Sequence, residues 1–244
     1  MSPTADSSAP APRLPSLPAR IAGVLLSPRE TFAAVAATPR WVGMLATTVI
    51  VVAACQGLFL STEVGQQAFV DQQVSSREGL GVQVSDEAYA QIERLARYAV
   101  YVQIGGALVG VPVVTFAAAG ILFGVFAGLL GGQATYRQTL AVVAHSGAVS
   151  IVQQLFVTPL NYLRESMTSP ANLSVFFPML DEGGFLASLL GTIELFTVWW
   201  VLLLAIGLGV LYRRRTGPIA GALFAVYAVI AVAVAAVKAA LGGA

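Results

Sequence analysis

The stretch that decides the fold is YAVYVQIGGALVGVPVVTFAAAGILFGVFAGLLG, residues 98–131, which has no charged side chain in 34 positions. A transmembrane helix needs about 20 predominantly apolar residues. The run is too long for one untilted helix, yet too short for two crossings and the turn between them. We therefore expect one long tilted helix that is kinked at Pro112.

The composition of the whole chain indicates the same environment. Of its 244 residues, 57% are hydrophobic and 10% are charged, and the mean hydropathy is +0.80. A soluble domain keeps about 25% of its residues charged, so we predict an integral membrane protein. The net charge is +1 and no basic patch is large enough to follow a phosphate backbone, which argues against a nucleic-acid partner. Twelve of the 13 basic residues are arginine, which with the abundance of alanine favours a bacterial chain, in the cytoplasmic (inner) membrane.

Four further runs are long enough to cross a bilayer, residues 41–61, 136–161, 185–212 and 218–241. The expected fold is therefore all-α, a polytopic bundle of five transmembrane helices within residues 41–241. If the first run lies flat on the membrane, the number of spans is four. Residues 1–18 are rich in proline and serine and are expected to form a disordered tail.

The placement of arginine orients the bundle, because cytoplasmic segments carry an excess of Lys and Arg. With a cytoplasmic N-terminus, the inner segments hold eight basic residues against two acidic ones, and the outer segments hold five against nine. We therefore place the N-terminus inside the cell and the C-terminus outside. In the acidic outer loop 62–97, Ser85 or Asp86 is expected to cap a helix that continues into the second span. The expected cytoplasmic anchors are Arg137, Arg213, Arg214 and Arg215.

Residues 19–40 are expected to form a short amphipathic helical segment on the cytoplasmic side. Ser27 is placed as the N-cap of a helix that has proline at its first position and Glu30 three residues past the cap. Phe32 and Val35 share one face of this helix, and arginines flank it. The pattern favours a helix lying in the headgroup plane beside anionic lipid. The alternative is a cytoplasmic helix packed under the bundle.

Small residues line one face of the second span and lead into a short turn. Glycine leaves bare backbone, so that another helix can approach closely. We expect a helix of the same chain to pack there, with the last span as the natural mate, and a second copy or a partner protein is the alternative. The next helix is expected to begin with a capping box formed by Thr135 and Gln138. The packing glycines are Gly120, Gly124, Gly128 and Gly132.

Glu194 is the only acidic residue well inside a predicted span, where a charged carboxylate costs several kcal/mol. Counting about 1.5 Å per helical residue puts it at the depth of Gln153 and Gln56, with Gln103 nearer the outer surface. We expect these four side chains to form one polar cluster, either as glue between helices or as a site for a small solute, a proton or a lipid headgroup. His145 lies about 15 Å nearer the cytoplasm by the same rise and is interpreted as a buried, satisfied histidine. With one histidine and one cysteine, no metal site is predicted.

Three motifs resemble one family. They are the helix of SPRETFAAVAATPRW, which ends in proline just before the first span, the double-glycine turn of GGQATYRQTLAVVAHS, and the tryptophan-containing FTVWWVLLLAIGLGVLYRR. Together these resemble the Yip family, five-pass membrane proteins named for interaction with the Ypt/Rab GTPases of eukaryotes, over residues 18–241. The resemblance implies a cytoplasmic N-terminus and five helices, and it brings no catalytic residues. The family's eukaryotic role in vesicle trafficking does not transfer to a bacterium, which has no Rab network.

The motifs of common enzymes are missing from the sequence, which has no paired-carboxylate, HExxH or GxSxG pattern. We therefore expect a non-catalytic membrane protein without a cofactor, whose partners are membrane lipids and either other proteins or further copies of itself. The alternative is a permease or lipid-handling protein that uses the cluster around Glu194. Permeases often contain paired broken helices and internal repeats, whereas this sequence shows one kink and no convincing repeat. No substrate is identified.

Overall fold

The computed structural model describes residues 15–180 and 184–242, and every element within them is a helix. The prediction of an all-α membrane protein is therefore confirmed. Within these residues four helices are long and apolar enough to cross a membrane: Val42–Leu60, Asp86–Leu129, Tyr136–Leu163 and Thr216–Ala240. Of the predicted tail 1–18, residues 1–14 lie outside the described residues, and the first helix already begins at Leu17.

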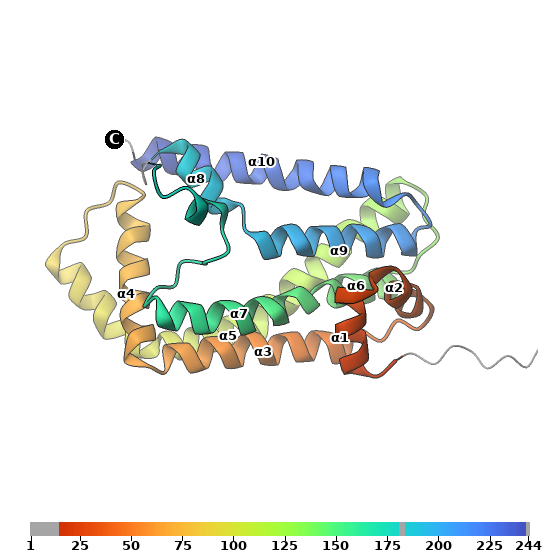
Figure 1. Cartoon of the computed structure of the whole chain (residues 1–244), viewed down its shortest axis with the longest axis horizontal. Helices are drawn as coiled ribbons and strands as arrows, with labels where there is room; N and C mark the ends of the chain where they lie inside the picture. The colour runs from red at the N-terminus through yellow and green to blue at the C-terminus, as the bar shows by residue number, and fades with distance from the viewer. Residues whose placement is uncertain (1–14, 181–183, 243–244) are drawn as a thin grey trace, which may run out of the picture.

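Five helices run along the length of the molecule (Figure 1). They are α3 (Val42–Leu60), α5 (Asp86–Phe123), α7 (Ala148–Leu163), α9 (Leu195–Leu211) and α10 (Thr216–Gly242). The short helices α1 (Leu17–Leu26), α2 (Pro28–Ala37) and α6 (Tyr136–Ser146) lie toward the right-hand end of this view. At the opposite end α4 (Glu63–Glu78) lies across the bundle, and α8 (Phe185–Thr192) lies toward the same end of this view.

The apolar stretch 98–131 lies in one long helix as far as Leu129. Ser85 starts α5 by accepting a hydrogen bond from the N–H of Ala88, and the chain stays helical through Pro112. Its last turn is a π-helix, Gly124–Leu129, after which Gly131 adopts a positive φ of 68°. A left-handed residue at this place is the usual way for a helix to end on glycine. The kink expected at Pro112 stays a prediction.

The prediction of an unbroken helix over residues 185–212 is wrong. The chain leaves the helix at Ile193 and Glu194, which have extended backbone angles, and this interruption separates α8 from α9. We call these two residues the helix break. Because of it α9 has 17 residues and is too short to count as a span by itself. The number of five spans therefore stays a prediction.

The N-terminal segment is two helices, not one, and it is packed against the bundle. Phe32 and Val35, the face expected to meet lipid headgroups, are fully buried. α2 lies against α9 and α6, so the packed alternative describes this helix better than the flat one. Ser27 stands before α2, but its side chain makes no capping hydrogen bond and no box forms with Glu30. Instead the hydroxyl of Thr31 donates to the carbonyl of Ser27 at 3.1 Å.

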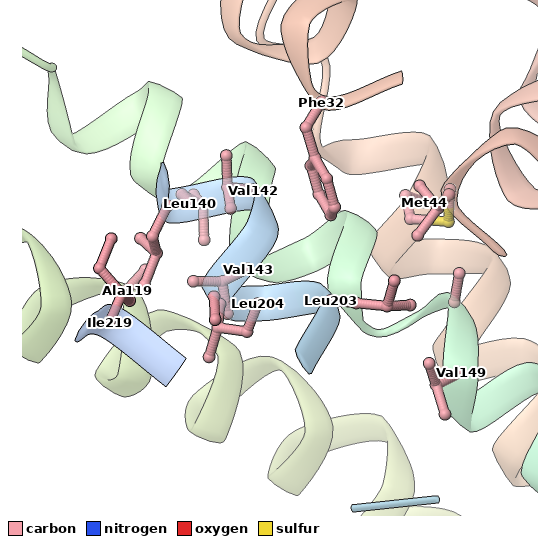
Figure 2. Close-up of a cluster of buried hydrophobic side chains, with 14 of the residues drawn as sticks. Phe32, Met44, Ala119, Leu140, Val142, Val143, Val149, Leu203, Leu204 and Ile219 are labelled. Atoms are coloured by element: carbon pink, nitrogen blue, oxygen red, sulfur yellow. The ribbon is translucent and has the colours of Figure 1, made fainter. Parts of the chain in front are cut away.

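The main hydrophobic core lies where α1, α2, α3, α6, α9 and the start of α10 meet, with further residues from α5 and α7. Figure 2 shows Phe32 and Met44 from the N-terminal part of the chain around Leu203 and Leu204 of α9. Residues 139–146 of α6 are all buried, so this short helix is the centre of the packing. The core therefore holds α1 and α2 firmly at one end of the bundle.

The glycine face of α5 is not packed as the sequence predicts. A side-chain carbon placed at Gly120, Gly124 or Gly128 would meet nothing within 4 Å, and all three residues are exposed. Only Gly132 is closely packed, where such a carbon would lie 2.5 Å from the ring of Tyr212. The reason is that α10, the expected mate, packs instead along α8 and α9.

Candidate functional site

The structure divides the predicted polar cluster. Gln56 of α3 and Gln103 of α5 line one cavity, whereas Glu194 lies at the helix break. Gln153 is half-buried on α7 and lines neither place. Within residues 15–180 and 184–242, no hydrogen bond joins Glu194 to any of the three glutamines. The depth count placed them at one level but could not assign the directions in which the side chains point.

Glu194 acts as the N-cap of α9. Its carboxylate accepts hydrogen bonds from the backbone N–H of Thr197 at 2.8 Å and from the Thr197 hydroxyl at 3.3 Å. The hydroxyl of Ser169 donates to the other carboxylate oxygen at 3.5 Å. A carboxylate at a helix N-terminus satisfies free N–H groups and is favoured by the helix dipole. The single carboxylate inside the predicted spans is therefore occupied in holding the start of a helix.

The backbone of the helix break is bonded from two directions. Tyr227 of α10 donates its hydroxyl hydrogen to the carbonyl of Thr192 at 2.9 Å and accepts the N–H of Glu194 at 3.2 Å. From the loop before α8, the N–H of Leu173 donates to the carbonyl of Ile193, and the N–H of Leu195 donates to the carbonyl of Ala171, each at 2.9 Å. Irregular backbone at membrane depth needs such partners, because lipid offers none. These bonds are what make the interruption possible.

A cavity of about 500 Å³ lies between α3, α5 and the junction of α6 and α7. Its lining has no charged side chain and is mostly aliphatic. The hydroxyls of Thr48 and Thr115 are bonded to carbonyls of their own helices. In contrast, the side chains of Gln56, Gln103 and Ser150 make no hydrogen bond within the described part of the chain. The cavity therefore presents free amide and hydroxyl groups in otherwise apolar surroundings.

A second buried polar contact joins residues that sequence reasoning did not connect. Arg20 of α1, 7% exposed, donates a hydrogen bond to Nε2 of the fully buried His145 at 3.0 Å and another to the carbonyl of Arg40 at 3.2 Å. The other imidazole nitrogen, Nδ1, is 2.7 Å from the carbonyl of Ala141. Since arginine has no acceptor, Nε2 accepts and Nδ1–H donates, so His145 is neutral. Burial, and next the charge of Arg40, lower the pKa of Arg20.

The end of the bundle that carries α1 and α2 is basic. Its turns are tied together, because Arg214 donates to the carbonyl of Leu130 at 3.0 Å and Gln138 donates to the carbonyl of Ala36 at 3.0 Å. Thr135 and Gln138 also form the reciprocal capping box of α6. No ion pair to a carboxylate is present within the residues that the structure describes. We define the basic end by its exposed arginines, Arg29, Arg40, Arg137, Arg213, Arg214 and Arg215.

None of the described residues form a group of histidine, cysteine or carboxylate side chains with the geometry of a metal site. When the chain is compared with known protein families, residues 22–237 match the family described as Yip1 domain. No curated protein and no solved structure matches the chain. The three motifs that resemble the Yip family all lie within this matched region.

Proposed function

We propose that this chain, which belongs to the Yip1 domain family, is a non-catalytic multi-pass membrane protein that organises membrane lipids or protein partners. The observation that carries the proposal is the basic end. Its arginines are exposed and, within the described residues, have no carboxylate partner in the chain, so their charge is free to act on a neighbouring surface. A cytoplasmic leaflet with anionic lipids attracts nearby Lys and Arg by about 1 kcal/mol each.

The orientation follows from the same residues. Basic residues gather on the cytoplasmic side of membrane proteins, so we place the basic end, and with it the N-terminus, inside the cell. The opposite end carries α4 and the start of α5, where acidic residues are more frequent. Together with the arginine-rich composition, this orientation supports a bacterial inner-membrane location with the C-terminus outside.

The N-terminal helices give the basic end a fixed shape. Phe32 of α2 is fully buried and its ring lies beside Gly207 of α9. Arg20 of α1 is bonded to His145 in the third span. Arg29 is therefore held on a docked helix, and Arg40 is held in the short link between α2 and α3, rather than on a free tail. A lipid or protein partner needs such an arrangement in order to meet a defined surface.

The test is retention of anionic lipid by the purified full chain in mixed nanodiscs, measured by lipid extraction and mass spectrometry. Replacing Arg213, Arg214 and Arg215 with glutamine is expected to lower the retained anionic lipid. The matched control replaces Arg77, Arg94 and Arg97 at the opposite end with glutamine and is expected to leave it unchanged. Equal retention in the two triple variants would contradict the proposal.

The helix break supports a second candidate, a permease or lipid-handling protein that uses Glu194. Interrupted helices line the substrate sites of many transporters, although here the peptide groups of the break are bonded to Tyr227 and to the loop. Glu194→Gln and Gln153→Ala variants in proteoliposomes test this candidate through solute flux and lipid scrambling. Loss of flux with unchanged thermal stability favours transport, and loss of stability alone favours a structural role for Glu194.

A further inference from the structure

We propose that the cavity between α3, α5 and the junction of α6 and α7 holds one acyl chain of an uncharged lipid whose head both donates and accepts hydrogen bonds, as a monoacylglycerol does. The site is separate from the basic end. Variants of the arginines are therefore expected to leave it unaffected, and the two proposals fail independently of each other.

The shape of the cavity favours a single chain. Its α5 wall extends from Gln103 to Ala118, a rise of about 22 Å at 1.5 Å per residue. A volume of about 500 Å³ spread over that length gives a mean width of roughly 5 Å. Carbon atoms in contact lie about 3.5–4 Å apart, so a channel of this width accepts one extended hydrocarbon chain and little more. A compact solute would leave most of the length empty.

The two amides lie toward one end of the cavity. Gly57 of α3 packs against Ile104 of α5, so the neighbouring residues Gln56 and Gln103 lie at the same level. At the other end Trp41 packs edge-on against Phe116, with ring centres 5.4 Å apart. The walls there are apolar except for Thr115, whose hydroxyl is already bonded to the carbonyl of Val111. A polar head is therefore expected beside the two amides, with its chain directed toward the basic end.

The two amides require a partner. Neither Gln56 nor Gln103 makes a side-chain hydrogen bond within the described residues, and both are only half-buried. An amide that gives up water for apolar surroundings without a new partner loses about 1–3 kcal/mol. Each amide both donates and accepts, so hydroxyl and ester groups satisfy it. An ionised head is disfavoured because no charged side chain lines the cavity to balance it.

Glycine keeps the channel open on its α5 side. Gly106 and Gly110 line the cavity, and a side-chain carbon at either position would meet nothing within 4 Å. Leucine there is expected to fill the channel without disturbing a packed neighbour. Gly105 is the matched control, since it is equally free of neighbours on the same helix but does not line the cavity.

The experiment uses the purified full chain in detergent micelles and a monoacylglycerol that carries a photoreactive diazirine near the middle of its chain. Cross-links are expected on the cavity walls of α3 and α5, and labelling is expected to fall at least about tenfold, or 1.4 kcal/mol, in Gly106→Leu and in Gly110→Leu. Gly105→Leu should label like the natural chain. A fatty acid with the same diazirine should label more weakly, because its head is charged.

Thermal unfolding of each variant separates a blocked channel from a misfolded protein. If Gly110→Leu does not fold, Gly106→Leu alone decides the result. Labelling that is unchanged in a folded cavity variant would overturn the proposal, as would cross-links that gather on the exposed face of α10. Stronger labelling by the fatty acid than by the monoacylglycerol would also overturn the uncharged-head assignment.

Discussion

The guanidinium of Arg20 donates a 3.0 Å hydrogen bond to Nε2 of His145, a residue 125 positions further along the chain. The contact joins α1, which lies outside the spans, to the helix at the centre of the main core. Arg20 is also bonded to the carbonyl of Arg40, just before α3. The Arg20 side chain thus connects the N-terminal helices with the residues just before α3 and with His145 of α6.

Removing this side chain should destabilise the fold. Arg20→Ala leaves Nε2 of His145 buried without a donor, and an unpaired buried group costs about 1–3 kcal/mol. We expect the free energy of unfolding to fall by that amount, measured by denaturant unfolding in mixed micelles. Arg29→Ala is the control, because Arg29 is exposed and its loss should change stability by less than about 0.5 kcal/mol.

A double-mutant cycle tests whether the contact itself carries the effect. His145→Leu removes the acceptor, so adding Arg20→Ala to it should cost less than Arg20→Ala costs in the natural chain. A coupling energy of about 0.5–3 kcal/mol is expected for residues in contact. Strictly additive effects of the two changes would show that the hydrogen bond does not contribute to stability.

The docking of α2 depends on a glycine. A side-chain carbon at Gly207 would lie 2.6 Å from Val142 and 3.0 Å from the ring of Phe32. Gly207→Ala should therefore push α2 away from α9 and cost about 1–3 kcal/mol. Phe32→Ala, which empties a fully buried position, should cost about 3–5 kcal/mol.

The displacement of α2 can be measured directly. A cysteine at Val35, which is buried in the natural chain, should react faster with a water-soluble maleimide when Gly207 is alanine, in a background where Cys55 is serine. Gly221→Ala is the control because nothing lies within 4 Å of that position. If the cysteine at position 35 reacts equally fast with glycine and with alanine at position 207, the docking of α2 does not rely on the contact at Gly207.

Tyr227 holds the helix break by both of its hydrogen bonds. Tyr227→Phe keeps the ring but leaves the carbonyl of Thr192 and the N–H of Glu194 without these partners. We expect a loss of about 1–3 kcal/mol in the free energy of unfolding. Glu194→Gln should cost less, since its amide oxygen still accepts the N–H of Thr197. The control is Tyr101→Phe, at a residue that is 72% exposed, and it should change the free energy of unfolding little. If Tyr101→Phe lowers that free energy as much as Tyr227→Phe does, the role of the Tyr227 hydroxyl in holding the helix break is contradicted.

The helix break could not be predicted from the sequence. Residues 185–192 and 195–211 are apolar and contain no proline, so their local pattern predicts one continuous helix. The interruption depends on Tyr227 and on the loop before α8, which are distant in sequence and supply hydrogen bonds that no local pattern records. The same holds for Arg20, whose partner is 125 positions away. In contrast, the long helix that contains residues 98–129 and the all-helical membrane fold follow from hydropathy and length alone.

The glycines of the long helix show what residue spacing can and cannot predict. Their spacing correctly identifies a bare helix face, but spacing does not say what faces it. Gly120, Gly124 and Gly128 face open space, whereas Gly106 and Gly110 line the cavity. The polar residues behave in the same way, because depth grouped Glu194 with Gln56 while the two side chains lie in separate places. What a given face of a helix meets depends on which helices pack beside it, and the packing of the whole bundle decides that.

The last prediction concerns the number of times that the chain crosses the membrane. α9 alone has 17 residues and spans about 26 Å, less than the hydrocarbon thickness of about 30 Å. We expect α8 and the helix break to complete the crossing. Five crossings put the two termini on opposite sides of the membrane. A reporter that is active only in the cytoplasm should work at the N-terminus and fail at the C-terminus, and one that is active only outside should do the reverse. If both termini report the same side, the prediction of five crossings is wrong. An even number of crossings would result if α8 and α9 entered and left the bilayer from one face, with the helix break as a re-entrant turn.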